Sequence, residues 1–165
     1  MTQWVLLLMI SLQPANVTPW ADTFPATAES IARASVQSPL FAGADGPART
    51  ATVLVSVAWF EGRFNAHAIG DHGHSHGMFQ SSRVPIEDLD EQTRQALGMM
   101  RASFAGCHAR KAEDWLGHYA SGGSTCTNVG GLIASRHRMS LAMRLWKDHP
   151  SRQIDPFCTV HLHHP

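Results

Sequence analysis

Apolar residues gather in five segments of this chain, and glycine or proline residues separate most of them. The segment from residue 48 to 61 is apolar on nearly every face. This is typical of a buried helix, although its β-branched residues leave a strand as an alternative. The other four segments are also expected to be helices, with Thr27 as the N-cap of the first. They cover residues 26–36, 90–106, 112–119 and 132–147.

The pattern changes between residues 62 and 83, where glycines stand at positions 62, 70, 73 and 77. Glycine at this density indicates irregular backbone or a small β-hairpin. The chain shows no internal repeat, and 165 residues suit one domain. The sequence therefore predicts a mostly α-helical α+β domain over residues 26–150, with a small hairpin region and a loop-like tail over residues 151–165.

The first 25 residues are expected to form a signal peptide and a linker. The apolar run from Trp4 to Leu12 is too short to span a bilayer, but its length suits the core of a secretory signal. No Lys or Arg precedes the run, so the signal is incomplete. The alternative is a first helix or strand that packs on the domain. Prolines over residues 13–26 indicate a linker. Export would make the protein periplasmic or secreted.

Three cysteines allow at most one intramolecular disulfide. Cys107 and Cys126 flank a predicted helix and a turn, so they could meet, and a bond between them would suit an oxidising compartment. Two buried free thiols are the alternative. Cys158 lies in the tail and is expected to be unpaired.

The charge balance argues against several classes of partner. The formal net charge is +0 and charged residues make up only 16% of the chain. Such a surface has no strong field to attract nucleic acid or an acidic membrane. The chain has no phosphate-binding loop or dinucleotide fingerprint, so no cofactor is expected. We expect a monomer, and a neutral partner such as a sugar polymer is compatible with this composition.

Glu61 is the first candidate for chemistry because it closes the apolar segment directly after Trp59 and Phe60. A carboxyl group in such a place would be partly desolvated, which disfavours its charged form. A general acid has to hold its proton near neutral pH, so this setting suits one. Trp59 is the candidate for the apolar wall beside it. The alternative is a Glu that faces solvent at a helix end.

The residues that follow Glu61 form a spaced motif, with Phe64, Asn65, Ala68 and the run Gly77-Met78-Phe79-Gln80. Together with Glu61, this motif resembles a known family, the lysozyme-like domain of soluble lytic transglycosylases and goose-type lysozymes. The transglycosylase pattern is a Glu, an aromatic residue with Asn, an Ala and a later Gly-x-x-Gln run. The goose-type spacing is matched by Gly70, Asp71, Gly73 and the same final run. Tyr119-Ala120-Ser121-Gly122 is similar to the family's Tyr turn.

This resemblance implies an enzyme that cleaves the β-1,4 bond between N-acetylmuramic acid and N-acetylglucosamine in peptidoglycan glycan strands. Glu61 would protonate the glycosidic oxygen. In a transglycosylase it would then take a proton from the sugar's C6 hydroxyl, which leaves a 1,6-anhydro end. In an inverting hydrolase Asp71 would activate water. The residues expected to bind the substrate are Ser75, Phe79, Gln80 and Tyr119.

Neither subfamily fits in full, so both outcomes stay open, with the transglycosylase preferred. Asp71 stands where many transglycosylases have Ser, and Ser82 stands where goose-type enzymes have a second Asp. Asp71 could equally be a turn residue that binds its own loop. A further alternative is a non-catalytic glycan-binding protein that keeps the fold.

Histidine is abundant, with 11 residues. His72, His74 and His76 alternate, and on an extended strand they would share one face, as metal ligands do. Solvated loop histidines are the preferred interpretation, so no metal is expected.

Overall fold

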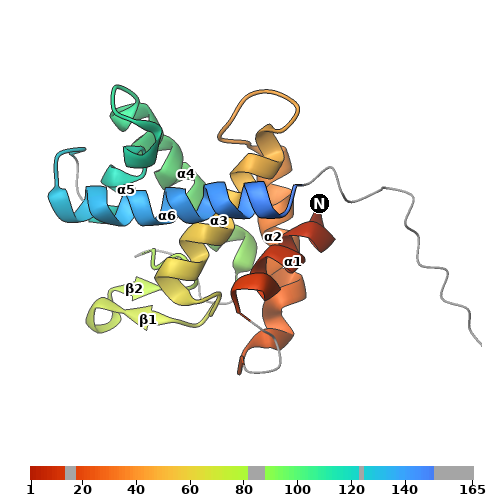
Figure 1. Cartoon of the computed structure of the whole chain (residues 1–165). Helices are drawn as coiled ribbons and strands as arrows, with labels where there is room; N and C mark the ends of the chain where they lie inside the picture. Colours follow the sequence, from red (N-terminus) through yellow and green to blue (C-terminus); the bar gives the residue numbers. More distant parts are fainter. Residues whose placement is uncertain (14–17, 82–87, 123–124, 151–165) are drawn as a thin grey trace, which may run out of the picture.

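The computed structural model describes residues 1–13, 18–81, 88–122 and 125–150. Within these residues the protein is mostly helical, with one two-stranded antiparallel sheet, as the sequence predicts (Figure 1). The α-helices are α1 (Thr2–Leu12), α2 (Phe24–Gln37), α3 (Gly46–Gly62), α4 (Leu89–Cys107), α5 (Gly117–Ser121) and α6 (Val129–Asp148). The strands are β1 (Ile69–Gly70) and β2 (Ser75–His76), and 3₁₀ turns form η2 (Ala21–Thr23), η3 (Asp71–Gly73) and η4 (Ala112–Asp114).

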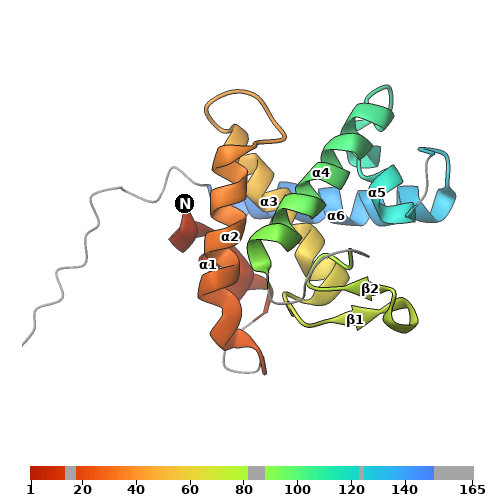
Figure 2. The ribbon, with the colours of Figure 1, turned by 180° about the vertical axis from the view of Figure 1, so that it is seen from behind.

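Helix α3 is the centre of the fold, as its all-round apolar character predicts. Ala51, Leu54, Val55, Val57 and Ala58 have no exposed surface. Each large apolar side chain buried in this way contributes about 1.5–3 kcal/mol relative to exposure. Helix α6 crosses α3 on one side, while α2 and α4 lie on the other (Figures 1 and 2). The strand alternative for this segment is therefore wrong.

Helix α1 packs against α2 and α3 through Trp4, Val5, Leu8 and Met9, which are all buried. The indole Nε1 of Trp4 also donates a hydrogen bond to the carbonyl of His149, 2.8 Å away. The N-terminal segment thus contributes to the core of the folded chain, and export through it stays a prediction. Within the described residues, no helix is both long and apolar enough to cross a bilayer.

Several helix boundaries differ from the predicted ones, and the last helix begins at Val129 rather than residue 132. The second helix begins at Phe24 rather than residue 26, because Pro25 has the fixed φ that suits a first turn. Thr23 therefore holds the N-cap position, and Thr27 is buried inside the helix. Part of the predicted linker, residues 14–17, lies outside the described residues.

The predicted helix over residues 112–119 is divided into η4 and α5. The chain breaks there because the backbone N–H of Leu116 donates to the hydroxyl of Ser135 at 3.0 Å instead of to a helical carbonyl. Helix α5 is thereby anchored to α6.

The disulfide between Cys107 and Cys126 is present, which confirms the predicted pairing. It ties the end of α4 to the segment before α6. Residues 151–165, with Cys158, lie outside the described residues.

Candidate functional site

The Gly77–Gln80 run packs directly against the end of α3, which brings Glu61 beside it. A Cβ atom added to Gly62 would lie 2.8 Å from the Cα of Met78. Only glycine permits this approach without a shift of the backbone. Gly62 therefore allows the hairpin region to lie close to the carboxylate of Glu61.

Helix α4 holds the same run from the other side through Gln92, which is 1% exposed. Its Oε1 accepts a hydrogen bond from the Met78 N–H at 3.0 Å, and its Nε2 donates to the Ala66 carbonyl at 3.3 Å. Gly77 has a φ of +77°, and a Cβ there would lie 2.2 Å from the Gln92 Oε1. A side chain at position 77 would therefore have to displace the amide of Gln92 and adopt a strained positive φ, so glycine suits this position.

The hairpin positions Asp71, Ser75 and Gln80. Strand β1 pairs with β2 through Ile69 opposite His76 and Gly70 opposite Ser75. The Ser75 hydroxyl donates to Asp71 Oδ2 at 2.6 Å, and the Gln80 Nε2 donates to the carbonyl of Gly77 at 2.9 Å. The side chain of Asp71 is thus bound to its own loop.

Tyr119, on α5, reaches the hairpin region. Its hydroxyl donates to the carbonyl of Phe79 at 3.0 Å, and its backbone N–H donates to the Ser103 hydroxyl at 3.1 Å. Burial raises the pKa of the Tyr119 phenol well above its usual value, and the Glu61 carboxylate raises it further, while Arg138 acts in the opposite direction. Tyr119 is therefore a neutral hydrogen-bonding group at physiological pH.

All the site residues suggested by the sequence line one hollow of about 460 Å³. Glu61 comes from α3, Tyr119 from α5, and the others from the hairpin region. Phe79 is only 2% exposed, and its carbonyl is the acceptor for Tyr119. The site residues that the sequence suggested, and that line this hollow, are Glu61, Asp71, Ser75, Phe79, Gln80 and Tyr119.

Sequence reasoning missed Arg138, on α6, which forms an ion pair with Glu61. Its Nη2 and Nε lie 2.7 and 3.2 Å from Oε1 of Glu61. The two side chains are 11% and 19% exposed. Both hydrogen bonds reach one carboxylate oxygen, so Oε2 remains available for other contacts.

The sequence did contain a signal for Arg138. It lies on the buried stripe of α6, at helical spacing from Gly131, Ser135, Ala142 and Leu145, all of which are buried. A charged side chain on a buried stripe requires a partner.

Trp59 does not form the expected apolar wall beside Glu61. Its ring lies 5.8 Å from that of Phe64, and the Arg63 guanidinium stacks 3.9 Å from its centroid. Residues two positions apart in a helix point to different sides, so Trp59 and Glu61 diverge. Phe60 instead lies 5.5 Å below the guanidinium of Arg138.

The histidines of the hairpin do not share one face, so the premise of the metal-site alternative was wrong. Asp71–Gly73 is a 3₁₀ turn, in which His72 has a φ of +56°, and only His76 lies in a strand. Among the described residues, no group of three His, Cys, Asp or Glu side chains is placed to hold a metal ion.

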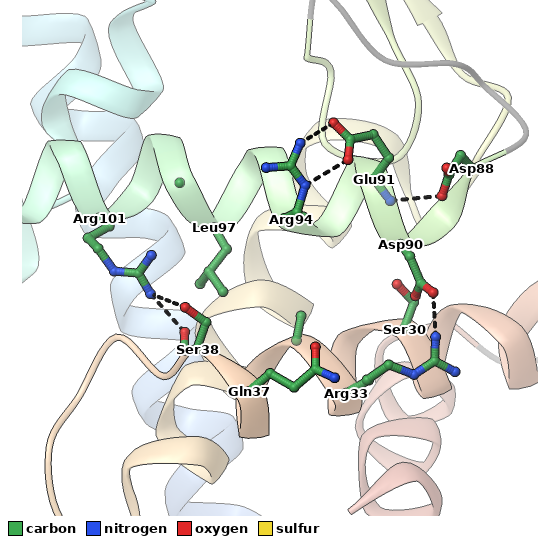
Figure 3. Close-up of a pocket in the computed structure, with 12 residues that line it drawn as sticks. Ser30, Arg33, Gln37, Ser38, Asp88, Asp90, Glu91, Arg94, Leu97 and Arg101 are labelled. Atoms are coloured by element: carbon green, nitrogen blue, oxygen red, sulfur yellow. Dashed lines mark hydrogen bonds and ion pairs between the residues drawn. The ribbon is translucent and has the colours of Figure 1, made fainter.

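A second hollow, of about 470 Å³, lies between α2 and α4 (Figure 3). Its arginines are engaged within it. Arg33 pairs with Asp90, Arg94 pairs with Glu91, and Arg101 donates to the carbonyl and hydroxyl of Ser38 (Figure 3). With its charges balanced internally, this hollow offers no evident anion site.

Comparison of the chain with protein-family models, with curated proteins and with solved structures found no match.

Proposed function

We propose that this protein is a lysozyme-like, peptidoglycan-cleaving lytic transglycosylase that acts outside the cytoplasm. The observation that carries the proposal is that Glu61, Gln80 and Tyr119, which are far apart in the sequence, line the same hollow. The resemblance to the transglycosylase family gives each of them a role, and a shared hollow is what those roles require. The neutral chain suits a largely neutral glycan.

In the proposed reaction Glu61 donates a proton to the glycosidic oxygen and then removes one from the C6 hydroxyl of N-acetylmuramic acid. The acetamido and C6 hydroxyl groups of the sugar act as nucleophiles in place of a second carboxylate, and the C6 oxygen closes the 1,6-anhydro ring as the glycosidic bond is lost. Oε2 of Glu61 suits these transfers because Oε1 already accepts from Arg138. The neutral phenol of Tyr119 lies in the same hollow and can donate to the substrate when it leaves the Phe79 carbonyl.

Hydrolysis is the second candidate, because Asp71 also lines the hollow. An inverting hydrolase would need Asp71 to activate water. Its bond with Ser75 engages Oδ2 and leaves Oδ1 for a water molecule. This bond also supports the alternative that Asp71 organises its own loop, which is why transglycosylation is preferred.

The test is digestion of purified peptidoglycan sacculi, followed by mass analysis of the released muropeptides. The expected products carry 1,6-anhydro ends. Reducing ends would instead favour hydrolysis by Asp71. The variant Glu61→Gln is expected to lose at least about 100-fold of the activity, since it cannot transfer the proton.

The matched control is Glu29→Gln, which changes an exposed carboxylate on α2 that pairs with Arg33. It should leave activity unchanged. If wild type and Glu61→Gln both bind sacculi but release nothing, the protein is a glycan-binding protein. If neither binds nor releases fragments, the proposed function is wrong.

A further inference from the structure

Among the described residues of the hairpin region, two polar atoms are buried without a hydrogen-bond partner: Oγ of Ser81 and Nδ1 of His76. Ser81 is 3% exposed, and it lines the same hollow as Glu61 and Gln80. Ser81 is not one of the site residues that the sequence indicates. A buried polar group without a partner destabilises the fold, and a ligand that supplies the partner would account for it.

The two residues lie directly opposite each other. The His76 N–H donates to the Ser81 carbonyl at 3.2 Å, and the Ser81 N–H donates to the His76 carbonyl at 3.0 Å. Residues that exchange both hydrogen bonds in an antiparallel bridge project their side chains from the same face. The backbone of this pair is therefore satisfied, and of the two side chains it is that of Ser81 that lines the hollow.

The neighbouring polar groups differ because they are already engaged. Ser75 donates to Asp71, and the amide nitrogen of Gln80 donates to Gly77. Among the described residues that line the hollow, Ser81 is the buried side chain whose hydroxyl has no such partner.

We propose that Ser81 is a sugar-binding point in the hollow that hydrogen-bonds a hydroxyl or acetamido group of the glycan. Its hydroxyl can both donate and accept a hydrogen bond. This combination suits a neutral polyol with amide substituents. The inference rests on the proposed function, because it assumes that the hollow receives a glycan.

The experiment measures binding of an N-acetylglucosamine tetramer by titration calorimetry in the Glu61→Gln background, where cleavage is blocked. Adding Ser81→Ala is expected to weaken binding by about 2- to 10-fold, the effect of one neutral hydrogen bond. In the enzyme with Glu61 intact, Ser81→Ala should raise KM and leave kcat nearly unchanged.

The matched control is Ser35→Ala, because Ser35 is also fully buried but lies in α2 and donates to the carbonyl of Ile31 at 2.7 Å. Its affinity for the tetramer should not change. Equal affinities for Ser81→Ala and its parent would overturn the inference while wild-type cleavage stands. Absence of both cleavage by wild type and binding by Glu61→Gln would overturn the proposed function, and the inference with it.

Discussion

The ion pair between Arg138 and Glu61 should be worth more than a surface salt bridge. The variant Arg138→Met removes the guanidinium and keeps much of the apolar stem. Because the pair is 11% and 19% exposed and one oxygen accepts two hydrogen bonds, its atoms are largely shielded from water. Hydrogen bonds to charged groups contribute about 1.5–3 kcal/mol, and desolvation offsets part of this. We therefore expect a coupling of about 2 kcal/mol.

The assay is a double-mutant cycle of urea unfolding, followed by far-ultraviolet circular dichroism, with Arg138→Met, Glu61→Gln and the double variant. Arg138→Met alone should lower the free energy of unfolding by about 2–3 kcal/mol, since it leaves a buried charge unpaired. With a urea dependence of about 2 kcal/mol per molar, the midpoint falls by about 1 M. The double variant should lose less than the sum of the two single losses.

A matched pair on the same helix serves as the control. Arg136 binds Asp114 at 2.8 Å, but the Arg136 side chain is 49% exposed. Its cycle with Asp114→Asn should give a clearly smaller coupling, because solvent screens the guanidinium. A coupling for Arg138 and Glu61 below about 0.5 kcal/mol, or equal to that of the control, would refute the argument from burial.

Three further predictions concern the frame of the site. Tyr119 is the sole tyrosine, and burial raises its pKa, so its contribution to stability is complete below about pH 10 and is lost as pH rises further. An alkaline titration should show tyrosinate absorbance together with unfolding, and tyrosinate absorbance that appears before unfolding would contradict this. Replacing Cys107 and Cys126, 19 residues apart, by Ala should lower the free energy of unfolding by about 3 kcal/mol in a urea titration, and an unchanged midpoint would exclude a stabilising bond. Gly77→Ala should lower the free energy of unfolding by about 2 kcal/mol or more in the same measurement. The loss should exceed that of Gly43→Ala, because Gly43 also has a positive φ but has open space around it, and equal losses would exclude a clash with Gln92.

Local patterns were sufficient for much of the fold. The segment that forms α3 can be predicted as a buried helix from its own residues, because it has no polar face over most of its length. The division between η4 and α5 could not be foreseen, because it depends on the hydroxyl of Ser135, 19 residues away from Leu116. Propensity describes a segment by itself, and here a tertiary hydrogen bond overrides it.

The candidate site was only partly predictable for the same reason. Glu61 and Gln80 belong to a motif with fixed spacing, so a resemblance could indicate them. Arg138 is 77 residues from Glu61 and belongs to no such motif. Its place on the buried stripe of α6 shows that it needs a partner, but not which carboxylate is that partner. The geometry of the hollow, with Tyr119 bound to the Phe79 carbonyl, likewise depends on how α5 packs.

Arg138 determines which atom of Glu61 can serve the proposed reaction. The sequence predicted a carboxyl group beside an apolar wall, whereas in the structure Nε and Nη2 of Arg138 both bind Oε1 of Glu61, 3.2 and 2.7 Å away. This contact fixes the orientation of the carboxyl group and leaves Oε2 for the proposed proton transfers. Without the guanidinium the carboxyl group can rotate, so we expect Arg138→Met to lower kcat more than it changes KM. Unchanged kcat in a folded Arg138→Met variant would mean that the ion pair serves stability alone.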